Sequence, residues 1–192
     1  MKKLIGLKKI KTAVFISGTG SNLKNLIKFS KIKKNIISID LIISDTIKAK
    51  GLKYGNQFNI KKKIFNYKNK KDAEKNILLT LKKNKIEFIC LAGYMKILSH
   101  NFLKKFKGKI INIHPSLLPK YKGLNTHSRA LMNKEKFAGC TVHYVTKKLD
   151  SGKIIMQSKV KITKKDNSVS IAKKVLKKEH KLYPAAILKI FN

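Results

Sequence analysis

The chain has 192 residues, 43% of them hydrophobic, which is enough for one buried core and predicts a single domain over residues 1–192. Its apolar runs are too short to cross a bilayer, and lysines interrupt the apolar part of the basic N-terminus, which argues against a signal peptide. We therefore expect a cytoplasmic protein without a membrane anchor, with residues 1–10 as a candidate basic extension.

The net charge of +37 first suggests a nucleic-acid partner. The basic residues are spread over the whole length, however, and Arg129 is the only arginine. Direct reading of bases relies on the forked side chain of arginine, so a general compositional drift explains the lysines better than a selected nucleic-acid surface. A positive field still helps to gather anionic small substrates.

Two cysteines, Cys90 and Cys140, each lie in an apolar, strand-like run. Neither belongs to a Cys-x-x-Cys or Cys/His spacing, so the sequence gives no support to a metal site. We expect both to be reduced core residues, as is usual in cytosolic proteins.

A glycine-rich turn, Gly-Thr-Gly-Ser-Asn at residues 18–22, separates a predicted strand over 10–17 from a predicted helix, which Ser21 or Asn22 is expected to cap. The N–H groups of such a turn and the positive end of the helix dipole form an anion site. The turn has neither the third glycine of the dinucleotide fingerprint nor the lysine of a P-loop, so neither NAD nor ATP is indicated. Taken alone, a structural tight turn explains it equally well.

The next segments alternate between strand and helix patterns. We expect a strand at 36–44, a loop and short helix at 45–58, an edge strand at 60–65, a helix at 71–85, a strand at 87–92 and a short helix from Ser99 to Phe106.

Residues 110–113 are apolar and β-branched apart from Asn112 and predict a buried strand that Pro115 ends. Because side chains alternate across a sheet, Asn112 and His114 point to the same side at the carboxyl end of this strand. An amide donor beside an imidazole suits a reaction in which an oxyanion forms and a proton moves. A core histidine with a turn-forming asparagine is the alternative.

The last third of the chain is richer in strands. We expect a helix from Asn125 or Thr126 that contains His127, a strand at 138–146 that contains His143, a turn at Asp150 and a strand at 153–160. Ser168 is expected to cap a last helix with Val169, Ala172, Val175 and Leu176 inward. From the residues alone, Asp150 is a turn aspartate that bonds its own backbone.

Alternating strands and helices up to about residue 110 predict an α/β fold, with a mostly parallel twisted sheet and helices on both faces. The later strands are expected to complete the same sheet. The glycine-rich turn and the pair Asn112 and His114 end different strands, so we expect them to line one crevice at the carboxyl edge of the sheet.

Residues 112–123, Asn-Ile-His-Pro-Ser-Leu-Leu-Pro-Lys-Tyr-Lys-Gly, resemble the signature of the phosphoribosylglycinamide formyltransferases, the folate-dependent enzymes of purine synthesis. Residues 17–23, 91–98 and 149–152 resemble the same family, and the likeness spans roughly residues 11–184. The resemblance implies a Rossmann-like formyltransferase fold. It also implies transfer of the formyl group of 10-formyltetrahydrofolate to the amine of 5-phosphoribosylglycinamide, without a metal.

The resemblance also assigns roles to single residues. Asn112 would donate to the oxyanion, His114 would donate to it or relay a proton, and Asp150 would hold His114 in its charged form. The residues implied to bind the substrate phosphate and ribose are Gly18, Gly20, Ser21, Asn22 and Glu179. Those implied to bind the folate are Lys70, Met95, Lys96, Ile97, Leu98 and Asn112.

Some positions depart from the family or stay open. Lys96 and either Lys70 or Lys71 stand where the family has arginines, and lysine does not replace a bidentate arginine. The family has a cis proline where this chain has Leu118–Pro119. His127 is either a substrate-loop contact or a surface residue, and His143 is a supporting or core histidine.

Two other functions are weighed against this one. One is another folate formyl enzyme, such as a formyltetrahydrofolate hydrolase or a methionyl-tRNA formyltransferase, which the ribonucleotide-type phosphate loop disfavours. The other is a basic nucleic-acid-binding protein without catalysis. We expect small-molecule substrates, neither nucleic acid nor membrane as a partner, and a monomer or homodimer.

Overall fold

The computed structural model describes residues 9–32 and 35–191, so residues 1–8 of the candidate basic extension lie outside the described part. Seven strands form the sheet: β1 (Ile10–Ile16), β2 (Ile37–Ser44), β3 (Lys61–Ile64), β4 (Phe88–Leu91), β5 (Lys109–His114), β6 (Phe137–Tyr144) and β7 (Ile154–Lys161). The helices are α1 (Ser21–Ser30), α2 (Lys53–Phe58), α3 (Lys70–Lys83), α4 (His100–Lys105), α5 (Thr126–Met132) and α6 (Ser168–Phe191), with a 3₁₀ turn η1 (Lys50–Leu52).

The sheet confirms the predicted fold class. Its strand order is β3-β2-β1-β4-β5-β6-β7, the strands from β3 to β5 are parallel, and β6 and β7 are antiparallel to their neighbours. β1 lies between β2 and β4, so the order of the strands reverses beside it. In open α/β sheets, ligands bind at the carboxyl ends of the strands next to such a reversal.

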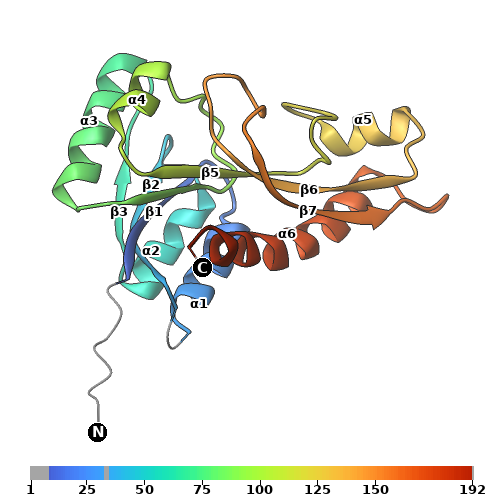
Figure 1. Cartoon of the computed structure of the whole chain (residues 1–192), viewed down its shortest axis with the longest axis horizontal. Coiled ribbons are helices and arrows are strands. Elements are labelled where there is room, and N and C mark those ends of the chain that lie inside the picture. The colour runs from blue at the N-terminus through green and yellow to red at the C-terminus, as the bar shows by residue number, and fades with distance from the viewer. Residues whose placement is uncertain (1–8, 33–34, 192) are drawn as a thin grey trace, which may run out of the picture.

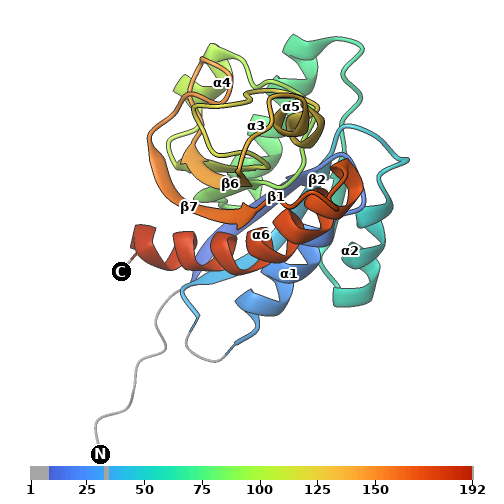
Figure 2. The same cartoon turned by 90° about the vertical axis from the view of Figure 1, so that its right-hand side faces the viewer.

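Helices cover both faces of the sheet, with α1, α2 and α6 on one face and α3 and α4 on the other (Figures 1 and 2). Alternate side chains of a strand point to opposite faces of the sheet. Val14 and Ile16 of β1 pack toward α1 and α6, whereas Ala13 and Phe15 pack toward α3 and α4. All four side chains are fully buried. Such burial on both faces explains why the parallel strands read as continuous apolar runs.

The longest helix, α6, is fixed to the centre of the sheet by a buried hydroxyl. Tyr183 is fully buried, and its hydroxyl donates a hydrogen bond of 2.9 Å to the carbonyl oxygen of Leu91, at the end of β4. This bond helps to place the preceding part of α6, which contains Glu179, beside the carboxyl edge of the sheet, where a site is expected. Within residues 9–32 and 35–191, no helix combines the length and apolar character that a membrane span requires.

Several local predictions can be compared with the structure. Ser99 caps α4 as predicted, since its hydroxyl accepts the N–H of Phe102, and the Leu118–Pro119 peptide bond is cis. The predicted cap of α1 is wrong: Gly20, at φ 74°, precedes the helix and no side chain caps it. Asn22 instead bonds to α6, a long-range contact that local sequence cannot show.

The predicted cap of α6 is also wrong. Asn167, and not Ser168, accepts the N–H of Ser170 and caps the helix. Val169 is 61% exposed instead of inward, because the buried face of α6 begins only at Ile171.

We predict that Tyr183→Phe lowers the free energy of unfolding by about 1–2 kcal/mol, because a buried carbonyl loses its hydroxyl donor while the ring still fills its place. Urea titration followed by circular dichroism measures this loss. Tyr54→Phe is the control, since the Tyr54 hydroxyl makes no hydrogen bond within the described part of the chain. Equal stability of the two variants would contradict the role of the Tyr183 hydroxyl.

Candidate active site

A cleft of about 980 Å³ opens at the carboxyl edge of the sheet. It lies where the loop after β4, the end of β5, the segment before α5, the loop after β6 and the inner face of α6 meet. Its lining includes Asn22, Met95, Lys96, Ile97, Leu98, Asn112, His114, Gly123, His127, His143, Asp150 and Glu179. The sheet therefore brings together residues that are up to 157 positions apart in the chain.

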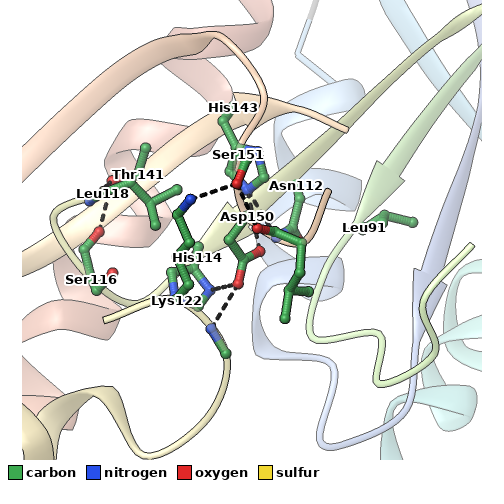
Figure 3. Close-up of polar contacts among 12 residues, drawn as sticks. Leu91, Asn112, His114, Ser116, Leu118, Lys122, Thr141, His143, Asp150 and Ser151 are labelled. Atoms are coloured by element: carbon green, nitrogen blue, oxygen red, sulfur yellow. Dashed lines mark hydrogen bonds and ion pairs between the residues drawn. The ribbon is translucent and has the colours of Figure 1, made fainter. Parts of the chain in front are cut away.

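The ion pair of His114 and Asp150 is at the centre of the cleft (Figure 3). His114 ends β5 and is 5% exposed, and its Nδ1 lies 3.3 Å from Oδ2 of Asp150. Its other nitrogen, Nε2, lies 2.9 Å from the carbonyl oxygen of Tyr121, which can only accept. Because both ring nitrogens face oxygen acceptors, the doubly protonated ring satisfies this arrangement best.

Asp150 reaches across the cleft from the loop between β6 and β7. The residue is 9% exposed, and its Oδ2 accepts the backbone N–H of Gly123 at 2.9 Å. Burial raises the pKa of the Asp150 carboxyl, but the hydrogen bond from the Gly123 N–H and the charge of His114 oppose this, and the pKa lies below its ordinary value. Asp150 is therefore an ionised partner of distant groups, and not a turn aspartate bonded to its own backbone.

Asn112 and His143 form the second half of this cluster. Nδ2 of Asn112 lies 3.2 Å from Nε2 of His143, and Nδ1 of His143 lies 2.9 Å from the carbonyl oxygen of Tyr144. That carbonyl fixes the proton of a neutral His143 on Nδ1, so Nε2 accepts from the amide of Asn112. The contact sets the orientation of the amide and leaves its second N–H free for the cleft.

The role of His143 is open from the sequence, and the structure places it next to two predicted site residues, Asn112 and Asp150. Its Nε2 also lies 3.6 Å from Oδ1 of Asp150, and it is 2% exposed. The signal that was missing is the register of the antiparallel pair, in which Asn112 of β5 lies opposite His143 of β6. No local pattern in the sequence gives that register.

The loop after β5 is fixed from the neighbouring strand. The hydroxyl of Thr141 donates to the carbonyl of Ser116 at 2.7 Å and accepts the N–H of Leu118 at 3.1 Å (Figure 3). This double contact sets the path of the chain directly after His114, so the catalytic candidate stands on a strand end that is held on both sides.

Asn22 and Glu179 form the opposite wall of the cleft. Nδ2 of Asn22 donates to the carboxylate of Glu179 at 2.7 Å, while Oδ1 of Asn22 is buried and has no hydrogen-bond partner in the described part of the chain. Burial raises the pKa of Glu179, and the hydrogen bond from Asn22 opposes this only in part.

The rest of the glycine-rich turn flanks this wall. The Ser17 hydroxyl accepts the N–H of Met95 at 2.9 Å, so the turn lies beside the loop after β4. Gly18, Gly20 and Ser21 do not themselves line the cleft. Packing also requires glycine at position 20, because a Cβ there would lie 2.7 Å from the Cα of Gly51.

The loop after β4 forms an apolar wall. Leu98 is 4% exposed, whereas Met95 and Ile97 are 61% and 56% exposed although they line the cleft. Apolar side chains left open in a concave site are typical of a pocket for a flat organic ligand. Nζ of Lys96 lies beside this wall, 3.8 Å from a carboxylate oxygen of Asp45.

Lys70 is not brought to this site, and Lys71 is not either. Both lie in the first turn of α3 and line a separate groove between α3 and α4. The sequence placed them near the folate only through the resemblance, and the direction of their side chains from the helix was not readable from it.

Cys90 and Cys140 are buried and free, as expected from their apolar runs. Among the residues that the structure describes, no three His, Cys, Asp or Glu side chains are grouped so that they could hold a metal ion.

The chain resembles known proteins in both sequence and fold. The model of the formyl transferase family matches residues 10–187. The chain is 38% identical to the phosphoribosylglycinamide formyltransferase of Bacillus subtilis over 95% of each chain. It is also 41% identical to the human trifunctional purine biosynthetic protein adenosine-3, but it spans only 18% of that protein.

A solved structure, that of the phosphoribosylglycinamide formyltransferase from Brucella melitensis, superposes with a TM-score of 0.90 at 42% identity and covers 96% of both chains. The matches in sequence and in fold thus extend over nearly the whole chain. The chain therefore belongs to the formyl transferase family, among its phosphoribosylglycinamide formyltransferases.

Proposed function

We propose that the protein transfers the formyl group of 10-formyltetrahydrofolate to the amine of 5-phosphoribosylglycinamide, giving 5-phosphoribosyl-N-formylglycinamide in de novo purine synthesis. The observation that carries the proposal is the cluster of Asn112, His114, His143 and Asp150 in a cleft with an apolar wall on one side and a polar wall on the other. We place this activity in the cytoplasm, in a monomer or homodimer that needs no nucleic acid.

The reaction begins when the free amine of the ribonucleotide attacks the formyl carbon. A C–N bond forms, and the carbonyl oxygen takes up negative charge in a tetrahedral intermediate. The free N–H of Asn112 donates to this oxygen, while the other N–H is bound to His143. A donor aimed at developing charge in a closed site is worth a factor of about 10²–10³ in rate.

The intermediate then collapses by breaking the bond between the formyl carbon and the folate nitrogen. The attacking amine loses a proton and the leaving folate nitrogen gains one. His114, charged and paired with Asp150, donates to the oxyanion or relays this proton. The ionised carboxylate of Asp150 favours the charged ring and fixes its orientation.

The two walls suit the two substrates. We assign the folate ring to Met95, Ile97 and Leu98, with Lys96 near its carboxylates. The phosphate is assigned to the turn of Gly18, Gly20, Ser21 and Asn22 at the N-terminus of α1, and the ribose hydroxyls to Glu179. Asn22, with its free buried Oδ1, can accept a hydrogen bond from a ligand on this wall. An assay with both substrates that follows the formylated product tests the proposal directly.

We predict that His114→Ala and Asp150→Ala each lower kcat by about 10²–10⁴-fold, because proton transfer and oxyanion stabilisation are lost while the fold is kept. Steady-state kinetics measures this, with circular dichroism to verify folding. His100→Ala, at an exposed position on α4, is the control and should keep its turnover. Near-normal turnover in either site variant would remove the role assigned to that residue.

Lys96→Ala is expected to raise KM for 10-formyltetrahydrofolate about 3–10-fold with little change in kcat, because a partly exposed charge contributes about 1 kcal/mol to binding an anion. Lys70→Ala is the matched control, since Lys70 lies outside the cleft. An equal rise of KM in both variants would mean that the general positive field, and not Lys96, attracts the folate.

Glu179→Gln is expected to change how stability depends on pH. Because the folded state raises the pKa of Glu179, the unfolded state releases this proton first and wild-type stability falls as pH rises above the ordinary value, near 4.3. The variant lacks this loss, so the free energy of unfolding of the variant, relative to that of the wild type, should rise between pH 4 and pH 7. Urea titration at several pH values measures the difference.

Asp150→Asn is the comparison for this experiment, because its sign is opposite. The pKa of Asp150 is lowered in the folded state, so its contribution to stability is present above the ordinary pKa and is lost as pH falls. The free energy of unfolding of the wild type, relative to that of Asp150→Asn, should therefore rise as pH rises through 4. The difference in unfolding free energy between wild type and variant should thus change with pH in opposite directions for Glu179→Gln and Asp150→Asn. A change in the same direction would contradict the pKa shifts assigned to the two carboxyls.

A further inference from the structure

A hollow larger than the active-site cleft lies elsewhere on the described surface. It is an open groove of about 1350 Å³ between α3 and α4, which lie next to each other on one face of the sheet (Figure 1). The groove runs from Lys70 and Ser99, where the helices begin, to Ile86 and Gly108 beyond their far ends. The helix α3, which forms one wall of the groove, has 14 residues and is therefore about 21 Å long at 1.5 Å per residue.

The floor of this groove is apolar. Leu79 is 58% exposed there and lies next to the partly buried Leu78. Four further apolar side chains line the groove beneath these two and are each at most 9% exposed: Leu81, Ile86, Phe102 and Phe106.

A buried carboxylate fixes the spacing of the two walls. Glu74 of α3 is 5% exposed and accepts both the backbone N–H of Ser99, at 2.8 Å, and the Ser99 hydroxyl. Because Ser99 also caps α4, this contact ties the starts of both helices together. The groove is thus a fixed feature of the fold.

The rim of the groove is basic. Its lysines are Lys70, Lys71, Lys75, Lys82, Lys105 and Lys107, and its acids are Glu74 and Glu87. Three of the lysines, Lys71, Lys75 and Lys82, follow one stripe of α3 at a spacing of four and seven residues. Glu74 is already bonded to Ser99, so little negative charge faces this stripe.

We propose that this groove binds an acidic amphipathic helix of another protein, with the apolar face of that helix on Leu78 and Leu79 and its Glu or Asp residues against the lysine rim. A helix with apolar residues at i, i+3, i+4 and i+7 fits a groove of this length. The charge of the rim selects an acidic partner over a neutral one.

Charge also argues against a second copy of the chain in the groove. Each copy carries a net charge of +37, so a symmetric contact would set lysines against lysines. The chain has nine acidic residues, none of them adjacent in sequence, and so offers no acidic segment of its own. The complementary acids have to come from a different molecule.

The groove shares no lining residue with the active-site cleft. Binding there can therefore be tested separately from the formyl transfer, and failure of one proposal leaves the other in place.

The probe is a designed 16-residue fluorescent peptide with leucine and phenylalanine at helical spacing and glutamates on both flanks of that stripe. We expect it to bind the full chain with a micromolar Kd at physiological salt, measured by fluorescence anisotropy. A scrambled peptide of the same composition should bind at least tenfold more weakly. Equal binding of the two peptides would show attraction by net charge alone and would overturn the proposal.

Variants of the chain locate the binding. Leu79→Asp should weaken binding at least tenfold without changing kcat, since the side chain is exposed and remote from the cleft. The double variant Lys75→Glu with Lys82→Glu should do the same. The matched control, Lys177→Glu with Lys181→Glu on α6, removes the same charge from another surface and should have little effect.

Three results would overturn the proposal. Equal weakening by the two lysine pairs would show a general electrostatic attraction. Unchanged binding in Leu79→Asp would place the peptide elsewhere. Self-association of the wild type in sedimentation that is lost in Leu79→Asp would assign the groove to a second copy.

Discussion

The carboxylate of Asp150 holds three separate parts of the site in one arrangement. It contacts His114 from β5, His143 from β6 and the backbone of Gly123 from the loop before α5. Asp150 and both histidines are buried, and an unpaired charge is costly in such a place. Removing this one charge would leave both imidazoles and the Gly123 N–H without a common partner.

The fold itself was largely predictable from the sequence. The apolar runs that became β1, β2, β4 and β5 are buried on both faces, so each stands out without any knowledge of its neighbours. The position of Asn112 and His114 at a strand end followed from two-residue alternation and from Pro115. These inferences use only short-range rules, and the structure agrees with them.

What the sequence could not give depends on contacts between distant segments. The register that sets His143 opposite Asn112 follows from the pairing of β5 with β6, and no spacing along the chain specifies it. Asn22 looked like a helix cap but bonds Glu179 on α6. Lys70 matched the family by position, yet its place in the first turn of α3 directs it to another surface. In each case tertiary packing overrides a local preference.

The bond between Nε2 of His114 and the Tyr121 carbonyl has a consequence for ligands of this site. The chain's own backbone satisfies Nε2 of His114, and Tyr121, which supplies the carbonyl, has a left-handed backbone conformation at φ 56°. A ligand that takes its hydrogen bond from His114 must first displace this carbonyl. Its apparent affinity is the intrinsic affinity multiplied by the fraction of molecules in which Nε2 of His114 is free of this carbonyl, so the strength of one backbone contact, as much as the fit of the cleft, sets how tightly such an inhibitor binds.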